Sequence, residues 1–180
     1  SCLGWREVPV DPSVLGPQAR ENQPQIEQIV LQSAFGGDEL ERELYLLRRQ
    51  VDKRIVEMQS SDQLSEAETA VLEDFYICSL SGRTITYKGM VRSAVLGEFY
   101  LDFKDDNFES PFAFYHRRFS TNTMPRWPLA QPMRMLGHNG EINTLLGNVN
   151  WMMAREADLS NDLWGDRFEQ LGDEIGLLNH

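Results

Sequence analysis

The spacing of hydrophobic and polar residues predicts one long helix near the middle of the first half of the chain. Over residues 38–58 the apolar positions recur at steps of three and four, as a stripe of Leu40, Leu44, Leu47, Val51, Ile55 and Met58. This period is typical of an amphipathic helix that packs its stripe against a core. Asp38 is the expected N-cap, and Glu41 the expected capping-box partner. A partner-binding helix is the alternative, and core packing is favoured because most amphipathic helices bury their stripe in their own domain.

Runs rich in β-branched and aromatic residues predict strands on both sides of this helix. The run 25–32 reads QIEQIVLQ and ends before two glycines, so we expect a short strand there. Runs 74–80 and 83–87 flank a Ser-Gly pair and predict a hairpin. Cys78, inside the first of these two runs, is expected to be a small buried hydrophobic residue.

The remaining segments outside the centre carry weaker patterns. Residues 1–23 contain several prolines and glycines and predict a loop. Residues 59–73 are polar and acidic and predict a loop with a short helix at best. Residues 91–110 and the acidic tail after 155 are weakly patterned.

The stretch from Phe112 to Arg155 carries the most distinctive polar clusters. One reads HRRFSTNT (116–123) and the other GHNGEIN (137–143), and each follows an apolar run that predicts a strand. The second cluster leads into helical spacing, with Ile142, Leu145, Leu146, Val149, Met152 and Met153. Polar groups at strand ends and helix starts are where sites are commonly built.

The first cluster has the chemistry of an anion clamp. In an extended run from Phe112, His116 and Arg118 would share one face, with Arg117 on the other. An arginine followed by short hydroxyl and amide side chains offers a fork for a carboxylate. Taken alone, a surface turn with incidental charges is the better explanation of this cluster.

The second cluster has the chemistry of an oxyanion site. Asn139-Gly140 could form a type I′ hairpin turn, but the helical spacing after it favours a strand-to-helix junction. A side-chain amide beside a free backbone N–H at such a junction can stabilise an oxyanion. The residues so far supply no nucleophile.

Composition limits the kinds of partner. With 180 residues, 41% hydrophobic and 25% charged, we expect one globular domain. The net charge of −11 and the pI near 4.7 argue against nucleic acid, and no apolar run is long enough for a membrane span. The N-terminal residues do not resemble a signal peptide. Two cysteines give no disulfide framework and three histidines no metal-ligand spacing, so we expect a reducing, cytoplasmic compartment and no metal.

Several runs of the chain together resemble the glutamine amidotransferase domain of glutamate synthases. They are HRRFSTNT (116–123), AQPMR (130–134), LGHNGEINT (136–144) and GNVNWM (147–152). FYICSLSGRTITYKGM (75–90) and LGWREVPV (3–10) resemble the same family. The resemblance covers nearly the whole chain and is weakest at 33–73 and 91–111.

The resemblance implies a fold and a reaction. The fold would be α+β, an N-terminal-nucleophile hydrolase sandwich with αββα layers, incomplete in this chain. An N-terminal cysteine would hydrolyse L-glutamine, and ammonia would pass through a tunnel to a synthase domain. That domain, carrying FMN and an iron–sulfur cluster, would convert 2-oxoglutarate to glutamate with electrons from ferredoxin or NAD(P)H. Residues 17–58 look more like ferredoxin-type chains of cyanobacteria and plastids, so a plastid stroma is the alternative location.

The resemblance also assigns roles to four residues of the two clusters. Arg118 would hold the α-carboxylate of glutamine, and Thr121 would contribute to the same pocket. The Asn139 side chain and the Gly140 N–H would form the oxyanion hole. Arg117 stands where the family usually has a small residue.

One departure from the family concerns the nucleophile. Cys2 follows Ser1 and lies just before LGWR, whereas the family's nucleophilic cysteine is the first residue and lies well upstream. We therefore expect residues 1–180 to be part of a single domain, without its nucleophile strand and its later part, and inactive alone. The alternatives are another class-II amidotransferase, such as those that make amidophosphoribosylamine or glucosamine phosphate, and a non-catalytic binding module that keeps the fold.

Overall fold

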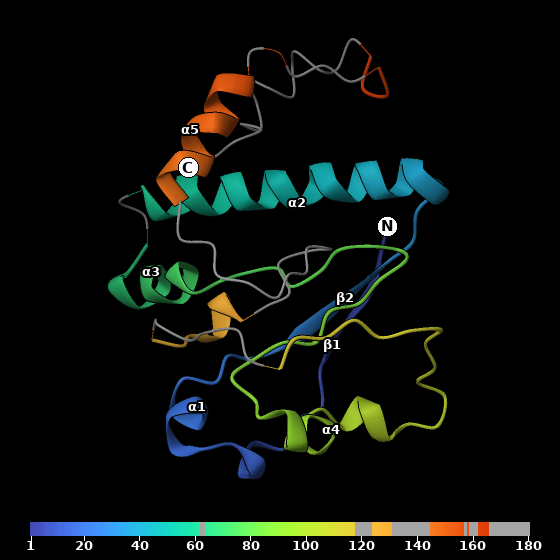
Figure 1. Ribbon diagram of the computed structural model, residues 1–180, viewed down its shortest axis with the longest axis vertical. Helices are drawn as coiled ribbons and strands as arrows, with labels where there is room; N and C mark the ends of the chain where they lie inside the picture. Colours follow the sequence, from blue (N-terminus) through green and yellow to red (C-terminus); the bar gives the residue numbers. More distant parts are fainter. Residues whose placement is uncertain (62–63, 118–123, 131–144, 157, 159–161, 166–180) are drawn as a thin grey trace.

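The computed structural model describes residues 1–61, 64–117, 124–130, 145–156, 158 and 162–165. The elements, in chain order, are β1 (Cys2–Glu7), η1 (Pro12–Val14), α1 (Pro17–Glu21), β2 (Glu27–Leu31), α2 (Gly37–Gln59), α3 (Glu66–Glu73), η2 (Ser93–Val95), α4 (Leu96–Phe99), η3 (Leu101–Lys104), η4 (Trp127–Leu129) and α5 (Leu145–Glu156), where η marks a 3-10 helix. Figure 1 shows the small sheet between α2 on one side and α1 and α4 on the other. Across these residues, no helix has the length and apolar character needed to cross a bilayer.

The sheet described here is an antiparallel pair, β1 with β2. Trp5 lies opposite Ile29 and Glu7 opposite Glu27, with an irregularity in register between Cys2 and Gly4. The predicted strand at 25–32 is confirmed over Glu27–Leu31. The pair leaves large apolar side chains in solvent, and Trp5 is 65% exposed.

The loop predicted for residues 1–23 is wrong, because the segment contains β1, η1 and α1. Its prolines do not prevent this structure. Pro12 and Pro17 are the first residues of η1 and α1, where the backbone N–H that proline lacks would form no hydrogen bond within the helix. The Asp11 carboxylate caps η1 by accepting a hydrogen bond from the Ser13 N–H, at 2.9 Å.

The predicted long helix is confirmed as α2, but its start differs from the prediction. Gly36 is the N-cap residue, without a side-chain cap. Asp38 instead forms an ion pair with Arg83, at 2.5 Å. Glu41 accepts hydrogen bonds from the Ser81 hydroxyl and the Gly82 N–H, at 2.8 and 2.9 Å. The predicted capping box is therefore wrong, because both carboxylates bind a distant loop.

Burial on α2 is spread around the helix and does not follow the predicted stripe. Leu47, a stripe residue, is 39% exposed, whereas Leu46 is 5% exposed and packs with Tyr45 and Trp164. The other stripe residues are half-buried. Figure 1 shows the 74–90 segment and the sheet on one side of α2, whereas Leu46 packs against Trp164, which comes after α5 in the sequence.

Helix α3 is more regular than the sequence pattern predicted. A full capping box begins it: the Ser65 hydroxyl accepts from the Glu68 N–H, and the Glu68 carboxylate accepts from the Ser65 N–H. The S-x-x-E spacing is present in the sequence and is a recognised helix start. The prediction of a loop with at most a short helix at 59–73 gave this S-x-x-E spacing too little weight.

The predicted hairpin over 74–87 is wrong, because no strand forms in these residues. The turn at Ser81-Gly82 is present, but hydrogen bonds to side chains replace the backbone hydrogen bonds that would join two strands. The Ser81 hydroxyl oxygen accepts from the N–H groups of Arg83 and Thr84, and the Ser79 hydroxyl oxygen accepts from Thr86. Serine side chains that bind nearby backbone in this way compete with strand pairing.

The main core lies in irregular segments that carried weak sequence patterns. Its buried members lie in α1, α4 and η4 or directly after β1, η1 and α4: Val8, Leu15, Ala19, Phe99, Tyr100 and Trp127. The Phe99 and Tyr100 rings meet edge to face, with centroids 4.7 Å apart. Backbone hydrogen bonds join the two ends of this core, from Asp11 N–H to Phe99 O and from Leu101 N–H to Pro9 O.

A polar network fastens β1 to the same core. Arg6 donates to both carboxylate oxygens of Asp102, and its Nε donates to Gln28 Oε1 at 2.7 Å. The Tyr87 hydroxyl donates to Asp102 at 2.6 Å. The hydrogen bonds from the Arg6 guanidinium lower the pKa of the Asp102 carboxyl below its ordinary value.

Candidate functional site

The four predicted site residues lie outside the described residues. Arg118 and Thr121 fall in 118–123, and Asn139 and Gly140 fall in 131–144. The structure describes the chain directly before, between and after these two runs, over 112–117, 124–130 and 145–156. The helix predicted after the second cluster is confirmed as α5 over Leu145–Glu156.

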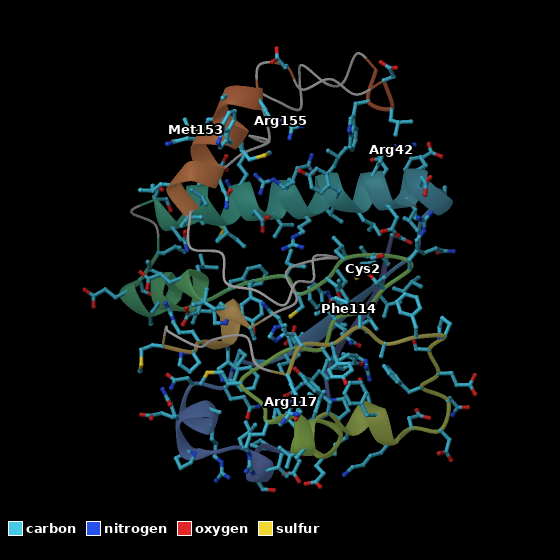
Figure 2. The ribbon with its side chains drawn as sticks, viewed as in Figure 1. Cys2, Arg42, Phe114, Arg117, Met153 and Arg155 are labelled. Carbon is cyan, nitrogen blue, oxygen red and sulfur yellow. The ribbon has the colours of Figure 1, made fainter. Side chains whose placement is uncertain are left out.

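The approach to the first cluster is exposed and contains no strand. Residues 112–117 are all exposed, including the aromatic side chains of Phe112, Phe114 and Tyr115. The strand predicted here is therefore wrong over 112–117. Figure 2 shows Arg117 on the α4 side of the molecule and Cys2 nearer α2.

The segment 124–130 lies between the two clusters along the sequence, and three contacts with other described residues hold it. The Trp127 indole N–H donates to Ala19 O at 3.0 Å, inside the core. The Lys88 ammonium donates to Pro128 O at 2.8 Å. Arg126 pairs with Asp74 at 2.5 Å on the surface. This segment therefore has a fixed place against α1 and the 74–90 segment.

The Trp127 ring is packed directly against Gly89. A Cβ placed on Gly89 would lie 2.2 Å from Cζ3 of the indole, far inside van der Waals contact. The ring is 2% exposed, so it has no free space to move aside. Only glycine allows the two segments to come this close.

Lys88 is the buried charged residue among those described, at 6% exposure. Its ammonium lies 4.4 Å from the Tyr76 ring centroid, a cation–π distance. Its carbonyl accepts from the Tyr100 hydroxyl at 2.7 Å. Burial lowers the pKa of the Lys88 ammonium below its ordinary value. The sequence prediction missed this residue, although a lysine within the apolar run TITYKGM was a visible signal.

A cavity of about 250 Å³ adjoins the same segment. Trp127, Tyr76 and Met90 contribute apolar lining, and the Asp74–Arg126 ion pair contributes charge. The lining contains no serine, threonine, cysteine or lysine among the described residues. This cavity therefore has the means to bind a small group but no nucleophile of its own.

The two cysteines differ in their surroundings, and neither lies where the sequence placed it. Cys2 begins strand β1 opposite Leu31 rather than lying in a flexible loop, and it is exposed. Cys78 lies in strand-free chain and is half-buried, and burial raises the pKa of its thiol. A raised pKa keeps the thiol protonated and weakly nucleophilic at neutral pH, as the prediction of an inert Cys78 requires. Within the described residues no three His, Cys, Asp or Glu side chains are grouped to hold a metal ion.

Comparison with known proteins gives one family and a consistent set of relatives. The family model "Glutamine amidotransferases class-II" matches residues 1–175. The chain is 60% identical, over 91% of its length, to ferredoxin-dependent glutamate synthase 2 of Synechocystis sp.. It is 51% identical over 94% of its length to the chloroplastic ferredoxin-dependent glutamate synthase of Oryza sativa, and 46% identical over 97% to the NADPH glutamate synthase large chain of Azospirillum brasilense. The chain spans about a tenth of the length of these relatives.

Proposed function

Because this chain belongs to the class-II glutamine amidotransferases, we propose that it forms part of the glutaminase domain of a glutamate synthase. The intact protein would hydrolyse L-glutamine and deliver the ammonia to 2-oxoglutarate, which it would reduce to glutamate. The observation that carries this proposal is the 60% identity to a glutamate synthase over 91% of the chain. The specific runs AQPMR and GNVNWM favour it over the class-II enzymes that make other amides or amines.

Arg118 and Thr121 would bind the substrate. The guanidinium of Arg118 presents two parallel N–H donors that match the two oxygens of the glutamine α-carboxylate. The Thr121 hydroxyl would contribute a further hydrogen bond in the same pocket. The segment 124–130, which follows them, is fastened to the core through Trp127 and would give them a rigid support.

Asn139 and Gly140 would stabilise the charge that develops during hydrolysis. Attack on the glutamine amide carbon turns its carbonyl oxygen into an oxyanion, and an amide N–H from each residue would bind that oxygen. Helix α5, described over Leu145–Glu156, follows this pair closely in the sequence, which supports a site near the start of a helix.

The nucleophile would come from another part of the intact protein. Cys2 is preceded by Ser1, whose backbone nitrogen donates to Gln32 O at 2.8 Å, and burial raises the pKa of the Cys78 thiol. We propose that residues 1–180 contribute to one amidotransferase domain with the αββα sandwich of N-terminal-nucleophile hydrolases. The mixed helices and two-stranded sheet are compatible with part of that fold.

The redox chemistry would also belong to the rest of the protein. FMN and an iron–sulfur cluster, both held by the synthase domain, would supply the electrons that reduce the product to glutamate. We favour ferredoxin over NAD(P)H as donor, because identity is 60% to a ferredoxin-dependent relative and 46% to an NADPH-dependent one. The cytoplasm or a plastid stroma would be the location, and several of the plant relatives are named chloroplastic.

The binding role is tested by Arg118→Ala in the intact protein. Loss of the carboxylate clamp should raise the KM for glutamine strongly, while glutamate synthesis from added ammonia continues. Arg117→Ala is the matched control and should change the glutamine KM much less. Equal glutamine kinetics in wild type and Arg118→Ala would refute the assignment.

The oxyanion role is tested by Asn139→Ala. Loss of one donor should lower kcat for glutamine by about 10²–10³-fold. The KM should change less, because the donor acts on charge that forms during the reaction. A change in KM alone would make Asn139 a binding or turn residue instead.

The two alternatives have their own discriminating results. Another class-II amidotransferase would release ammonia from glutamine but make no glutamate from 2-oxoglutarate. A non-catalytic module would bind glutamine without hydrolysing it, and its intact chain would have no cysteine at the mature N-terminus. Sequencing that terminus and assaying both half-reactions separates the three.

A further inference from the structure

The segment 124–130 occupies a special position between the two proposed halves of the site. Along the sequence it follows the run with Arg118 and Thr121 and precedes the run with Asn139 and Gly140. A displacement of this segment would therefore act on both halves. Its three attachments are the hydrogen bond from Lys88, the hydrogen bond from Trp127 and the surface ion pair of Arg126.

These three attachments differ in how well they are shielded from water and in how strongly they hold the segment. Arg126 and Asp74 are both more than half exposed, and ion pairs of this kind contribute little because water screens them. The Trp127 indole is held mainly by packing in the core. Lys88 differs from both, because the residue is buried and its ammonium donates to one backbone oxygen, Pro128 O. A charge-assisted hydrogen bond in a site shielded from water is short and directional.

Lys88 is itself fixed by the core. The Tyr100 hydroxyl binds its carbonyl, and Tyr100 is fully packed against Phe99. The face of the Tyr76 ring lies 4.4 Å from its ammonium and stabilises the charge there. On the next residue, Gly89 allows the Trp127 ring into direct contact. Lys88 thus connects the rigid core at Tyr100 to the backbone of the 124–130 segment.

We propose that Lys88 is a positioning residue for glutamine hydrolysis, which it supports by holding the 124–130 segment through Pro128 O. This inference rests on the proposed function, since it needs Arg118 and Asn139 to act on glutamine. Lys88 contacts neither the substrate nor the reacting atoms in this role. It sets the relative placement of the carboxylate clamp and the oxyanion hole, and misplacement by about 1 Å can cost on the order of 10²-fold in rate.

The test is Lys88→Met in the intact protein, which keeps the length of the side chain but removes the donor and the charge. Glutamine-dependent glutamate synthesis should lose about 10- to 100-fold in kcat/KM, with changes in both kcat and KM. Synthesis from added ammonia, measured on the same preparation, should stay at the wild-type level. Lys88→Arg restores a cationic donor and should recover part of the loss. Lys104→Met, which removes an exposed lysine on η3, is the control for loss of charge and should leave both activities unchanged.

Two results would overturn the inference. One is wild-type glutamine kinetics in Lys88→Met, and the other is an equal loss of the glutamine and ammonia activities, which would mark a purely structural role. If Lys88→Met does not fold, Lys88→Gln keeps a polar side chain but is one atom shorter and uncharged, so it loses the donor to Pro128 O and should give the same selective loss. Unchanged glutamine kinetics in Lys88→Gln would then refute the positioning role. Arg118→Ala and Asn139→Ala, assayed beside them, separate failure of this inference from failure of the proposed function.

Discussion

Helix α2 and the aromatic core around Tyr100 relate sequence pattern to burial in opposite ways. α2 is 23 residues long and has the clearest period in the chain, yet Leu46 is its buried residue. The core comes from short helices and connecting segments with weak periodicity, and there Phe99 and Tyr100 are completely shielded from water. Periodicity reports the local conformation of one segment. Burial depends on which distant segments arrive against it.

The two regions are also stabilised differently. Along α2 the polar contacts are partly local, as in the ion pairs Arg49–Asp52 and Arg54–Glu57 at i, i+3 spacing, and its N-terminal turns also bind the 81–83 loop at the surface. Such pairs contribute about 0.2–0.5 kcal/mol each. In the core the hydrogen bonds join residues far apart in sequence, such as Trp127 to Ala19. We therefore expect substitutions in the core to destabilise the molecule more than substitutions on α2.

The largest effect should come from Phe99→Ala. The ring is completely buried between Tyr100 and Trp127, so its loss leaves a cavity and should cost about 3–5 kcal/mol. Hydrogen exchange on the intact protein should show faster exchange of the Asp11 amide, which donates to Phe99 O. Unchanged protection at Asp11 would show that the core is not a cooperative unit.

A smaller effect should come from Leu46→Ala on α2. Leu46 packs with Tyr45 and Trp164, and its truncation should cost about 2–3 kcal/mol, as measured by hydrogen exchange along α2. Leu47→Ala is the matched control on the next residue. Because Leu47 is exposed, its truncation should cost less than about 1 kcal/mol. Equal costs at the two positions would show that other parts of the intact protein cover this face of α2.

The smallest effect, and one that depends on pH, should come from Asp102→Asn. The native pKa of Asp102 is lowered, so the stability it contributes is complete above its ordinary pKa of about 4 and is lost as the pH falls through the lower native value. At neutral pH the variant should lose about 1 kcal/mol, since Arg6 is half exposed and screened. Hydrogen exchange of β1 as a function of pH would measure this. If the protection of β1 is lost with the same steepness in the variant as the pH falls, another carboxylate governs that loss.

How far the sequence predicted the fold follows from the same comparison. The strand over 25–32, helix α2 and helix α5 were predictable because each carries its own period. The hairpin prediction at 74–87 was wrong because the Ser79 and Ser81 hydroxyl oxygens accept hydrogen bonds from backbone N–H groups. Strand propensity assumes that these N–H groups bind the carbonyl groups of a partner strand. Strand β1 was missed because it forms by pairing with β2, and each of its paired residues has a partner at least 20 positions away.

In the candidate site, too, some residues could be predicted from the sequence and one could be found only from the structure. Arg118, Thr121, Asn139 and Gly140 were predicted from short-range motif chemistry and the family resemblance, and their roles stay predictions. The positioning role proposed for Lys88 could not be predicted from the sequence. It depends on Pro128 O and the Tyr76 ring, which the fold brings to the Lys88 ammonium. Periodicity and motif spacing contain no information about such contacts.

The two-stranded sheet has a practical consequence for preparing this polypeptide. A pair of strands with Trp5, Leu3 and Val30 in water offers hydrogen-bonding edges and apolar surface to any similar chain in solution. At the high concentrations used for crystallisation or NMR, a preparation of these 180 residues alone would therefore self-associate through β1 and β2. Lysine in place of Leu3 or Val30 would place charge at that surface and keep the preparation monodisperse.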